Sequence, residues 1–136
     1  MKSRAFLFSV ILVAIAGCGG EDGPVAYPVK GMVTFQGKPV TQGSILFTST
    51  NPELPGANGR LGADGSYQLT TREQGDGAAA GEYKVIIRAF DGPEQPSDTS
   101  SAPPRPLVPL KYTKPGSTPL TKTVKKQELN RIDFEL

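Results

Sequence analysis

The amino-acid sequence predicts an all-β protein, an antiparallel two-sheet sandwich of about seven strands that follows a signal peptide. Short segments in which apolar and polar residues alternate recur along the chain, and this period of two is typical of half-buried strands. In residues 18–136, glycine and proline contribute 28 of 119 residues, which indicates many turns. That part of the chain carries no sustained apolar period of 3.6 residues, so helices are not expected to dominate.

Residues 1–17 are predicted to form the signal peptide. Lys2 and Arg4 give it a positive start, and the twelve residues Ala5–Ala16 that follow are apolar except for Ser9. At about 1.5 Å per residue a helix of this length covers roughly 18 Å, well short of the roughly 30 Å hydrocarbon layer. The segment therefore suits the apolar region of a signal peptide and is too short to span a membrane. A helix buried in the domain is the alternative.

The apolar segment ends in four residues that resemble the lipobox of bacterial lipoproteins. Ile15 is aliphatic, Ala16 and Gly17 are small, and Cys18 is the only cysteine of the chain. The resemblance implies that a signal peptidase recognises the first three and cleaves before Cys18, which then carries a diacylglycerol on its sulfur. Two or three acyl chains hold a protein at a membrane, whereas one alone binds only marginally. An incidental buried thiol is the alternative for Cys18.

The residues after the cysteine predict how the domain is held. Residues 18–26 are expected to be a flexible tether, since Gly19–Pro24 is small and polar and extends roughly 20 Å at about 3.4 Å per residue. The residue after the cysteine is Gly19 and not aspartate, and in this the chain resembles lipoproteins passed to the outer membrane in bacteria with two membranes. The expected location is therefore exported and lipid-anchored, at the outer membrane, facing the periplasm or the cell surface.

Residues 27–136 are predicted to form the sandwich. In the first strand the odd-numbered residues of Val29–Phe35 share one face, and Gln36–Pro39 is expected to form the turn after it. A hairpin is predicted around Asp64 and Gly65, a dipeptide typical of tight turns. The other predicted strands are Ser44–Ser49, Gly59–Gly62, Ser66–Thr70, Gly81–Arg88, Leu120–Lys125 and Arg131–Leu136. Their residues expected in the core are Ile45, Phe47, Tyr67, Leu69, Tyr83, Val85, Ile87, Ile132, Phe134 and Leu136.

Residues 91–109 are predicted to form a loop. This segment holds six prolines and no aromatic residue, and proline cannot donate to a sheet ladder. An insertion without a task, a binding loop and a linker are all compatible with this composition. Asp91, Glu94 and Asp98 offer oxygen ligands but lack the glycine and glutamate pattern of a calcium-binding EF-hand loop, so no metal site is predicted.

The predicted strands carry a second resemblance. Three groups of residues look like successive signatures of carboxypeptidase regulatory-like domains: Gly31–Val40 with Gly43–Phe47, Ala63–Leu69, and Gly81–Val85. The end of the chain is similar to that of small bacterial lipoproteins made of a lipobox and one such domain, at Lys111, Tyr112, Pro115, Leu120, Thr121, Val124, Asn130 and Phe134–Leu136. The resemblance implies a transthyretin-like sandwich over residues 27–136. In the carboxypeptidases this domain accompanies the enzyme without being catalytic, so no peptidase activity is implied.

The composition argues against most catalytic chemistry. The chain has no histidine, which excludes a Ser-His-Asp triad and histidine-ligated metals, and a single cysteine excludes an internal disulfide. Hydrolases of the transthyretin-like type rely on histidines. Paired carboxylates remain as a route to catalysis, but Asp64 falls in a turn, and Glu82 and Glu135 are expected to face solvent. No catalytic, metal-binding or cofactor-binding residue is predicted, and the protein is expected not to be an enzyme.

The leading prediction is a non-catalytic, lipid-anchored binding or structural module of the cell envelope, with an envelope protein or a polysaccharide as its partner. A carbohydrate- or ion-binding module that uses the sandwich loops is the alternative, and a hydrolase of the transthyretin-like type ranks below it. Tyr67 and Tyr83 are expected as core rings, with a sugar-stacking platform as the alternative. Nucleic acid is not an expected partner, because the basic residues are dispersed and their largest local group, Lys122, Lys125 and Lys126, suits a solvated strand end.

Overall fold

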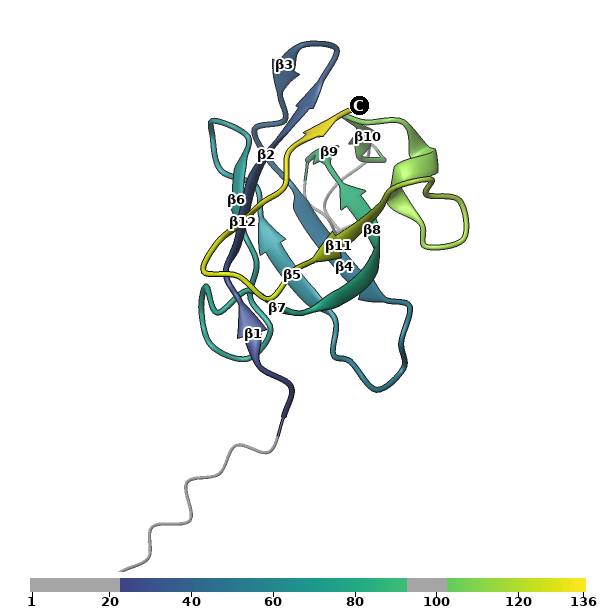
Figure 1. Cartoon of the computed structure of the whole chain (residues 1–136). Helices are drawn as coiled ribbons and strands as arrows, with labels where there is room; N and C mark the ends of the chain where they lie inside the picture. Colours follow the sequence, from purple (N-terminus) through teal and green to yellow (C-terminus); the bar gives the residue numbers. More distant parts are fainter. Residues whose placement is uncertain (1–22, 93–102) are drawn as a thin grey trace, which may run out of the picture.

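The computed structural model describes residues 23–92 and 103–136, and these form an all-β, sandwich-like protein (Figure 1). The described residues contain thirteen strands, several of two residues, and one 3-10 turn, Leu110–Thr113. The strand count therefore exceeds the predicted seven. Residues 1–22, which include Ile15, Ala16, Gly17 and Cys18, lie outside the described part. Within the described part, no helix has the length and apolar character needed to span a membrane.

One of the two larger sheets is wholly antiparallel and follows the predicted strands closely. Its order is β11 (Thr121–Val124), β8 (Gly81–Arg88), β4 (Ser44–Ser49) and β5 (Ala57–Arg60). β4 and β8 have the predicted bounds, and their alternating apolar residues are buried as predicted. The core residues from these two strands are Ile45, Phe47, Tyr83, Val85 and Ile87.

The other large sheet is centred on β2 (Val29–Phe35) and mixes strand directions. Its other strands are β3 (Lys38–Pro39), β6 (Ser66–Gln68), β12 (Asn130–Arg131) and β13 (Phe134–Glu135). β3 and β6 run antiparallel to β2, whereas β12 and β13 run parallel to it. The prediction of one antiparallel strand at Arg131–Leu136 is thus wrong. The segment runs parallel to β2, and a break divides it into β12 and β13. The segment crosses over from β11 in the opposite sheet, so no hairpin turn forces it to be antiparallel.

Two predicted turns are present, but the strands that flank them differ from the prediction. The turn after β2 is tighter than expected, since Gln36 and Gly37 both have positive φ, as in the favoured hairpin turns, and β3 begins at Lys38. Gly65 also has a positive φ of 79°. The hairpin predicted around it is present only in part. Asn58 and Thr70 form one antiparallel bridge, and the Gly62 N–H donates to the Ser66 carbonyl, but β5 has its ladder with β4 and β6 has its ladder with β2. This turn connects the two sheets, and Leu61 is buried at the crossing.

The remaining strands form two short ladders at the ends of the sandwich. β1 (Ala26–Tyr27) pairs with β7 (Ala78–Ala79), so the sheet structure begins at the last residue of the predicted tether. β9 (Phe90–Asp91) pairs with β10 (Arg105–Pro106), which corrects the prediction of loop throughout 91–109. Pro106 is tolerated because a strand of a two-stranded ladder has a free edge where its missing N–H is not needed.

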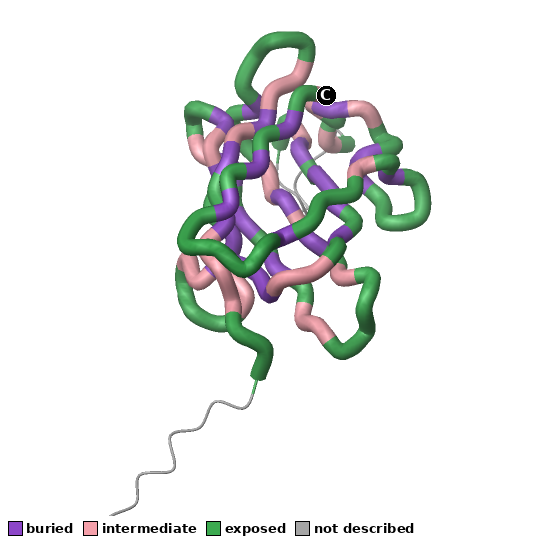
Figure 2. The backbone as a smooth tube through the Cα atoms, viewed as in Figure 1, coloured by how far each residue is buried: buried purple, intermediate pink, exposed green. Residues whose placement is uncertain are grey.

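The core lies between the two large sheets, and Figure 2 shows the buried positions concentrated along their strands. The Phe47 ring centroid lies 5.8 Å from that of Tyr83 and 6.2 Å from that of Phe134, so aromatic contacts join the sheets. Tyr67 is also buried, which confirms that Tyr67 and Tyr83 are core rings and removes them as a sugar-stacking platform. Ile132 and Phe134 are buried as predicted, and Leu136 is partly buried against the core.

Candidate functional site

The outer face of the β2 sheet carries a row of polar side chains. Lys30 on β2 is paired in register with Arg131 on β12 and with Gln68 on β6. All three are exposed, because their neighbours along each strand turn inward. Around this row lies a hollow of about 540 Å³, which we name the outer groove. It is lined by Lys30, Gly31, Met32, Arg60, Gly62, Ser66, Tyr67, Gln68, Leu129 and Arg131.

The outer groove is positively charged. Lys30, Arg60 and Arg131 line it, and none of its lining residues is acidic. Gln68 and the Ser66 hydroxyl add uncharged hydrogen-bonding groups, while Met32 and Leu129 add apolar surface. This combination suits a ligand that carries negative charge and hydroxyl groups.

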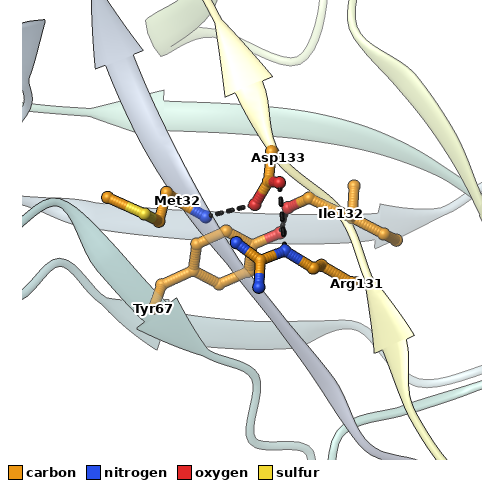
Figure 3. A network of polar contacts seen from close by, with 5 residues as sticks. All are labelled: Met32, Tyr67, Arg131, Ile132 and Asp133. Atoms are coloured by element: carbon orange, nitrogen blue, oxygen red, sulfur yellow. Dashed lines mark hydrogen bonds and ion pairs between the residues drawn. The ribbon is translucent and has the colours of Figure 1, made fainter.

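One carboxylate reaches this site from its side (Figure 3). The Met32 N–H donates to Asp133 Oδ1 at 2.9 Å, and Arg131 Nε donates to Asp133 Oδ2 at 3.2 Å. The Arg131 and Asp133 side chains are 70% and 48% exposed, so this ion pair adds little to stability. Its effect is geometric: it holds Arg131 through Nε and does not engage the two terminal guanidinium nitrogens.

The same residues explain why β12 and β13 are separate strands. In a continuous parallel ladder at this register, the Met32 N–H would donate to the carbonyl of Ile132. That carbonyl instead accepts a 2.5 Å hydrogen bond from the Tyr67 hydroxyl, and the Asp133 carboxylate accepts the Met32 N–H (Figure 3). Burial, and secondly the charge of Asp133, raise the pKa of Tyr67, so its hydroxyl stays protonated and donates.

Gly31 makes this arrangement sterically feasible. A Cβ atom at position 31 would overlap the carbonyl group of Ile132. The break in the ladder, the orientation of Asp133 and the position of Arg131 in the outer groove therefore depend on one glycine.

A second hollow adjoins the outer groove. It has a volume of about 340 Å³ and is lined by Asn58, Gly59, Arg60, Gln68, Thr70, Gln74 and Gly75. We name it the amide hollow, because three of its side chains are carboxamides. It shares Arg60 and Gln68 with the outer groove, so the two hollows lie side by side. Gln68 is held in place by a 3.2 Å hydrogen bond from Nε2 to the carbonyl of Gly75.

The carboxylates considered for hydrolysis do not form a site. The hydroxyl and the backbone N–H of Ser66 both donate to Asp64 Oδ1, and these hydrogen bonds lower the pKa of Asp64. An exposed carboxylate with a lowered pKa is ionised at neutral pH and is poorly suited to act as a general acid. Glu82 on β8 and Glu135 on β13 are exposed and belong to different sheets.

The metal ligands and the basic group considered from the sequence add no second candidate site among the described residues. The described residues contain no group of three His, Cys, Asp or Glu side chains placed to bind a metal. Of the three carboxylates in the proline-rich segment, Asp91 belongs to β9, while Glu94 and Asp98 lie outside the described residues. Lys122, Lys125 and Lys126 are exposed. Lys125 and Lys126 follow β11, as expected of a solvated strand end, whereas Lys122 lies within β11 with its Nζ 5.5 Å from the centroid of the Phe134 ring.

Sequence reasoning missed the basic residues of the outer groove. Lys30 and Arg131 are separated by 101 positions and meet only because β12 pairs with β2 in parallel. The sequence showed only that these residues occupy solvent-facing positions in alternating segments. Many residues without a binding role occupy such positions too. The residues predicted for lipidation and peptidase recognition, Ile15–Cys18, belong to the part of the chain that is not described.

Comparison with protein-family models found no match. Searches of curated proteins and of solved structures gave no match either.

Proposed function

We propose that this protein is a non-catalytic, lipid-anchored binding module of the cell envelope, and that the outer groove is its ligand site. The observation that carries the proposal is the convergence of Lys30, Arg60 and Arg131 in one depression without an acidic residue in its lining. Catalysis by two carboxylates would need a pair of them facing one cleft. A groove built on paired strands offers fixed charges and hydrogen-bond donors, which is what recognition requires.

The anchor and the domain type are further parts of this proposal. The lipobox-like residues Ile15–Cys18 support lipidation of Cys18 and residence at the outer membrane, facing the periplasm or the cell surface. The resemblance of residues 27–136 to carboxypeptidase regulatory-like domains supports a transthyretin-type sandwich, and the all-β fold with two large sheets is compatible with it. In this arrangement the lipid restrains the domain near the membrane while the groove engages an envelope component.

Lipidation is tested by Cys18→Ser. The variant should stay unprocessed and unacylated, because the thiol that accepts the diacylglycerol is missing. The measurement is partition between detergent and aqueous phases together with the mass of the intact protein. The wild-type protein should enter the detergent phase with acyl mass attached. An unchanged membrane fraction for the variant, without added mass on the wild type, would contradict the anchor.

Binding through the outer groove is tested by crosslinking in living cells. A photo-crosslinking residue replaces Leu129 at the border of the groove, and the same residue replaces Lys84, which is exposed on the opposite sheet. The expected result is an adduct with an envelope component from position 129 that is absent from position 84. Equal adducts from both positions, or none from 129, would contradict a binding role for the groove.

A further inference from the structure

We propose that the outer groove and the amide hollow together bind an acidic polysaccharide, with its negative groups at Lys30, Arg60 and Arg131 and its hydroxyl groups at the carboxamides. This inference rests on the proposed function and specifies the ligand class of the same site.

The pairing of like charges is the first reason. Lys30 and Arg131 are opposite each other on neighbouring strands of one sheet face. Like charges in directly opposed positions destabilise a sheet, and Asp133 offsets only Arg131, through Nε. An anionic group between the two side chains would remove the repulsion and gain charge-assisted hydrogen bonds.

The shape of the site is the second reason, and it favours a chain over a single ion. The outer groove, at about 540 Å³, falls in the range of sites for whole small molecules. The amide hollow of about 340 Å³ lies beside it and shares Arg60 and Gln68 with it. A ligand that covers both hollows meets the cations of Lys30, Arg60 and Arg131 and the carboxamides of Asn58, Gln68 and Gln74. Acidic polysaccharides carry negative groups and hydroxyls along one chain.

The surface composition is the third reason. Among the described residues, the exposed large hydrophobic side chains are Val25, Leu110 and Leu129, and only Leu129 borders the groove. The one aromatic residue in the lining, Tyr67, is buried and its hydroxyl is bound to Ile132. Neutral sugars and the bases of single-stranded nucleic acids are commonly held by stacking on exposed aromatic rings. A groove with cations and carboxamides in their place favours a charged glycan.

The experiment uses the lipidated protein in a neutral detergent. Polygalacturonate is the carboxylate-bearing chain, neutral dextran is the uncharged chain, and inorganic phosphate and glycerophosphoglycerol, the water-soluble headgroup of an anionic lipid, are the other sources of negative charge. Binding is measured by calorimetry at low and at physiological ionic strength. The expected result is binding of polygalacturonate that weakens with salt, with no binding of dextran and much weaker binding of phosphate.

The matched variants separate the groove from general attraction. The groove variant combines Lys30→Gln, Arg60→Gln and Arg131→Gln, and the control variant combines Lys38→Gln, Lys84→Gln and Lys114→Gln. Both lower the net charge by three, and the control positions are exposed and outside both hollows. The groove variant should lose at least about tenfold in affinity, since it removes three charge-assisted contacts with the negative groups of the chain. The control should keep the wild-type affinity, and thermal unfolding checks that both variants fold.

Three results would overturn the inference: no binding of polygalacturonate, equal loss of affinity in both variants, or preferential binding of glycerophosphoglycerol. The third would assign the groove to the headgroups of an anionic lipid surface. If polygalacturonate fails while the crosslink from position 129 persists, the ligand class is wrong and the binding role stands. If both fail, the proposed function fails with the inference.

Discussion

Gly31 owes its identity to a carbonyl group of another strand. It lies in the middle of β2, where glycine normally weakens a strand. A Cβ atom there would overlap the Ile132 carbonyl, which has turned away from the ladder to accept the Tyr67 hydroxyl. The glycine therefore serves a close approach between two strands, and no turn is involved.

Gly31→Ala should destabilise the protein by about 2–3 kcal/mol, the size of an overpacked core position with a disturbed hydrogen bond. The measurement is urea denaturation followed by circular dichroism. Gly116→Ala is the control, because a Cβ there would meet no atom within 4 Å. A Gly31→Ala variant as stable as the control would show that the ladder adjusts without cost.

Tyr67→Phe should cost about 1–2 kcal/mol, because the buried carbonyl of Ile132 loses its donor while the ring packing remains. Tyr83→Phe is the comparison, since the Tyr83 hydroxyl donates to the carbonyl of Ala79 at 2.8 Å. If the hydrogen bonds matter as described, Tyr67→Phe but not Tyr83→Phe should also disturb the backbone amide signals of Asp133 and Met32 in NMR spectra. Undisturbed signals in both variants would contradict the coupling.

At the scale of elements, the connection between β6 and β7 is organised by one carboxylate. Asp76 accepts the backbone N–H groups of Thr71, Arg72 and Glu73 at 2.7, 3.0 and 3.1 Å. Partial burial acts to raise the pKa of Asp76, but these three N–H groups and the charge of Arg72 outweigh it, so the pKa is lowered.

Because the folded state favours ionised Asp76, its contribution to stability is present above the ordinary pKa of 3.8 and is lost as the pH falls through the lowered value. Asp76→Asn should reduce the free energy of unfolding by about 1 kcal/mol at pH 7 and by less at pH 3. The expected loss is small because solvent screens the charge of a partly exposed carboxylate. Urea denaturation at the two pH values measures this. Glu73→Gln removes a neighbouring exposed carboxylate and should change neither value. An equal loss for Asp76→Asn at both pH values would exclude the charge as the cause.

Removal of the segment that contains β12 and β13 is predicted to have a large effect on the stability of the domain. Ile132, which lies between the two strands, and Phe134 on β13 are both buried. Loss of two such side chains costs roughly 5–8 kcal/mol, comparable to the whole stability of roughly 5–15 kcal/mol of a small domain. Removal of residues 131–136 should therefore abolish cooperative unfolding in a thermal scan. Glu135→Gln, an exposed change in the same segment, should leave the transition in place. A truncated domain that still melts sharply at the wild-type temperature would refute this.

At the scale of the whole molecule, the sequence predicted what depends on local alternation. β4 and β8 were found with their bounds and their buried residues, because the period of two is visible in the segment itself. The pairing of strands was less accessible. Asp64 and Gly65 gave the turn, but nothing local indicates that β5 and β6 join different sheets.

The candidate site depends on strand pairing, which the sequence does not reveal locally. Its charges come from β2, β5 and β12, and they converge only through the parallel pairing of residues that are 101 positions apart. The composition excludes histidine chemistry, because the chain has no histidine, but it holds no information on where cations gather. A neutral balance of 13 basic and 13 acidic residues in 18–136 conceals a depression whose lining is wholly basic among its charged residues.

The parallel pairing of β12 and β13 with β2 also has a consequence in time. β2 can pair with β3 and β6 early, but its parallel pairing cannot form until residues 130–135 have been synthesised, and loop closure over such a distance is slow. During synthesis, the edge of β2 that later pairs with β12 and β13 therefore stays open until the end of the chain is available. The topology makes closure of this sheet a late step of folding.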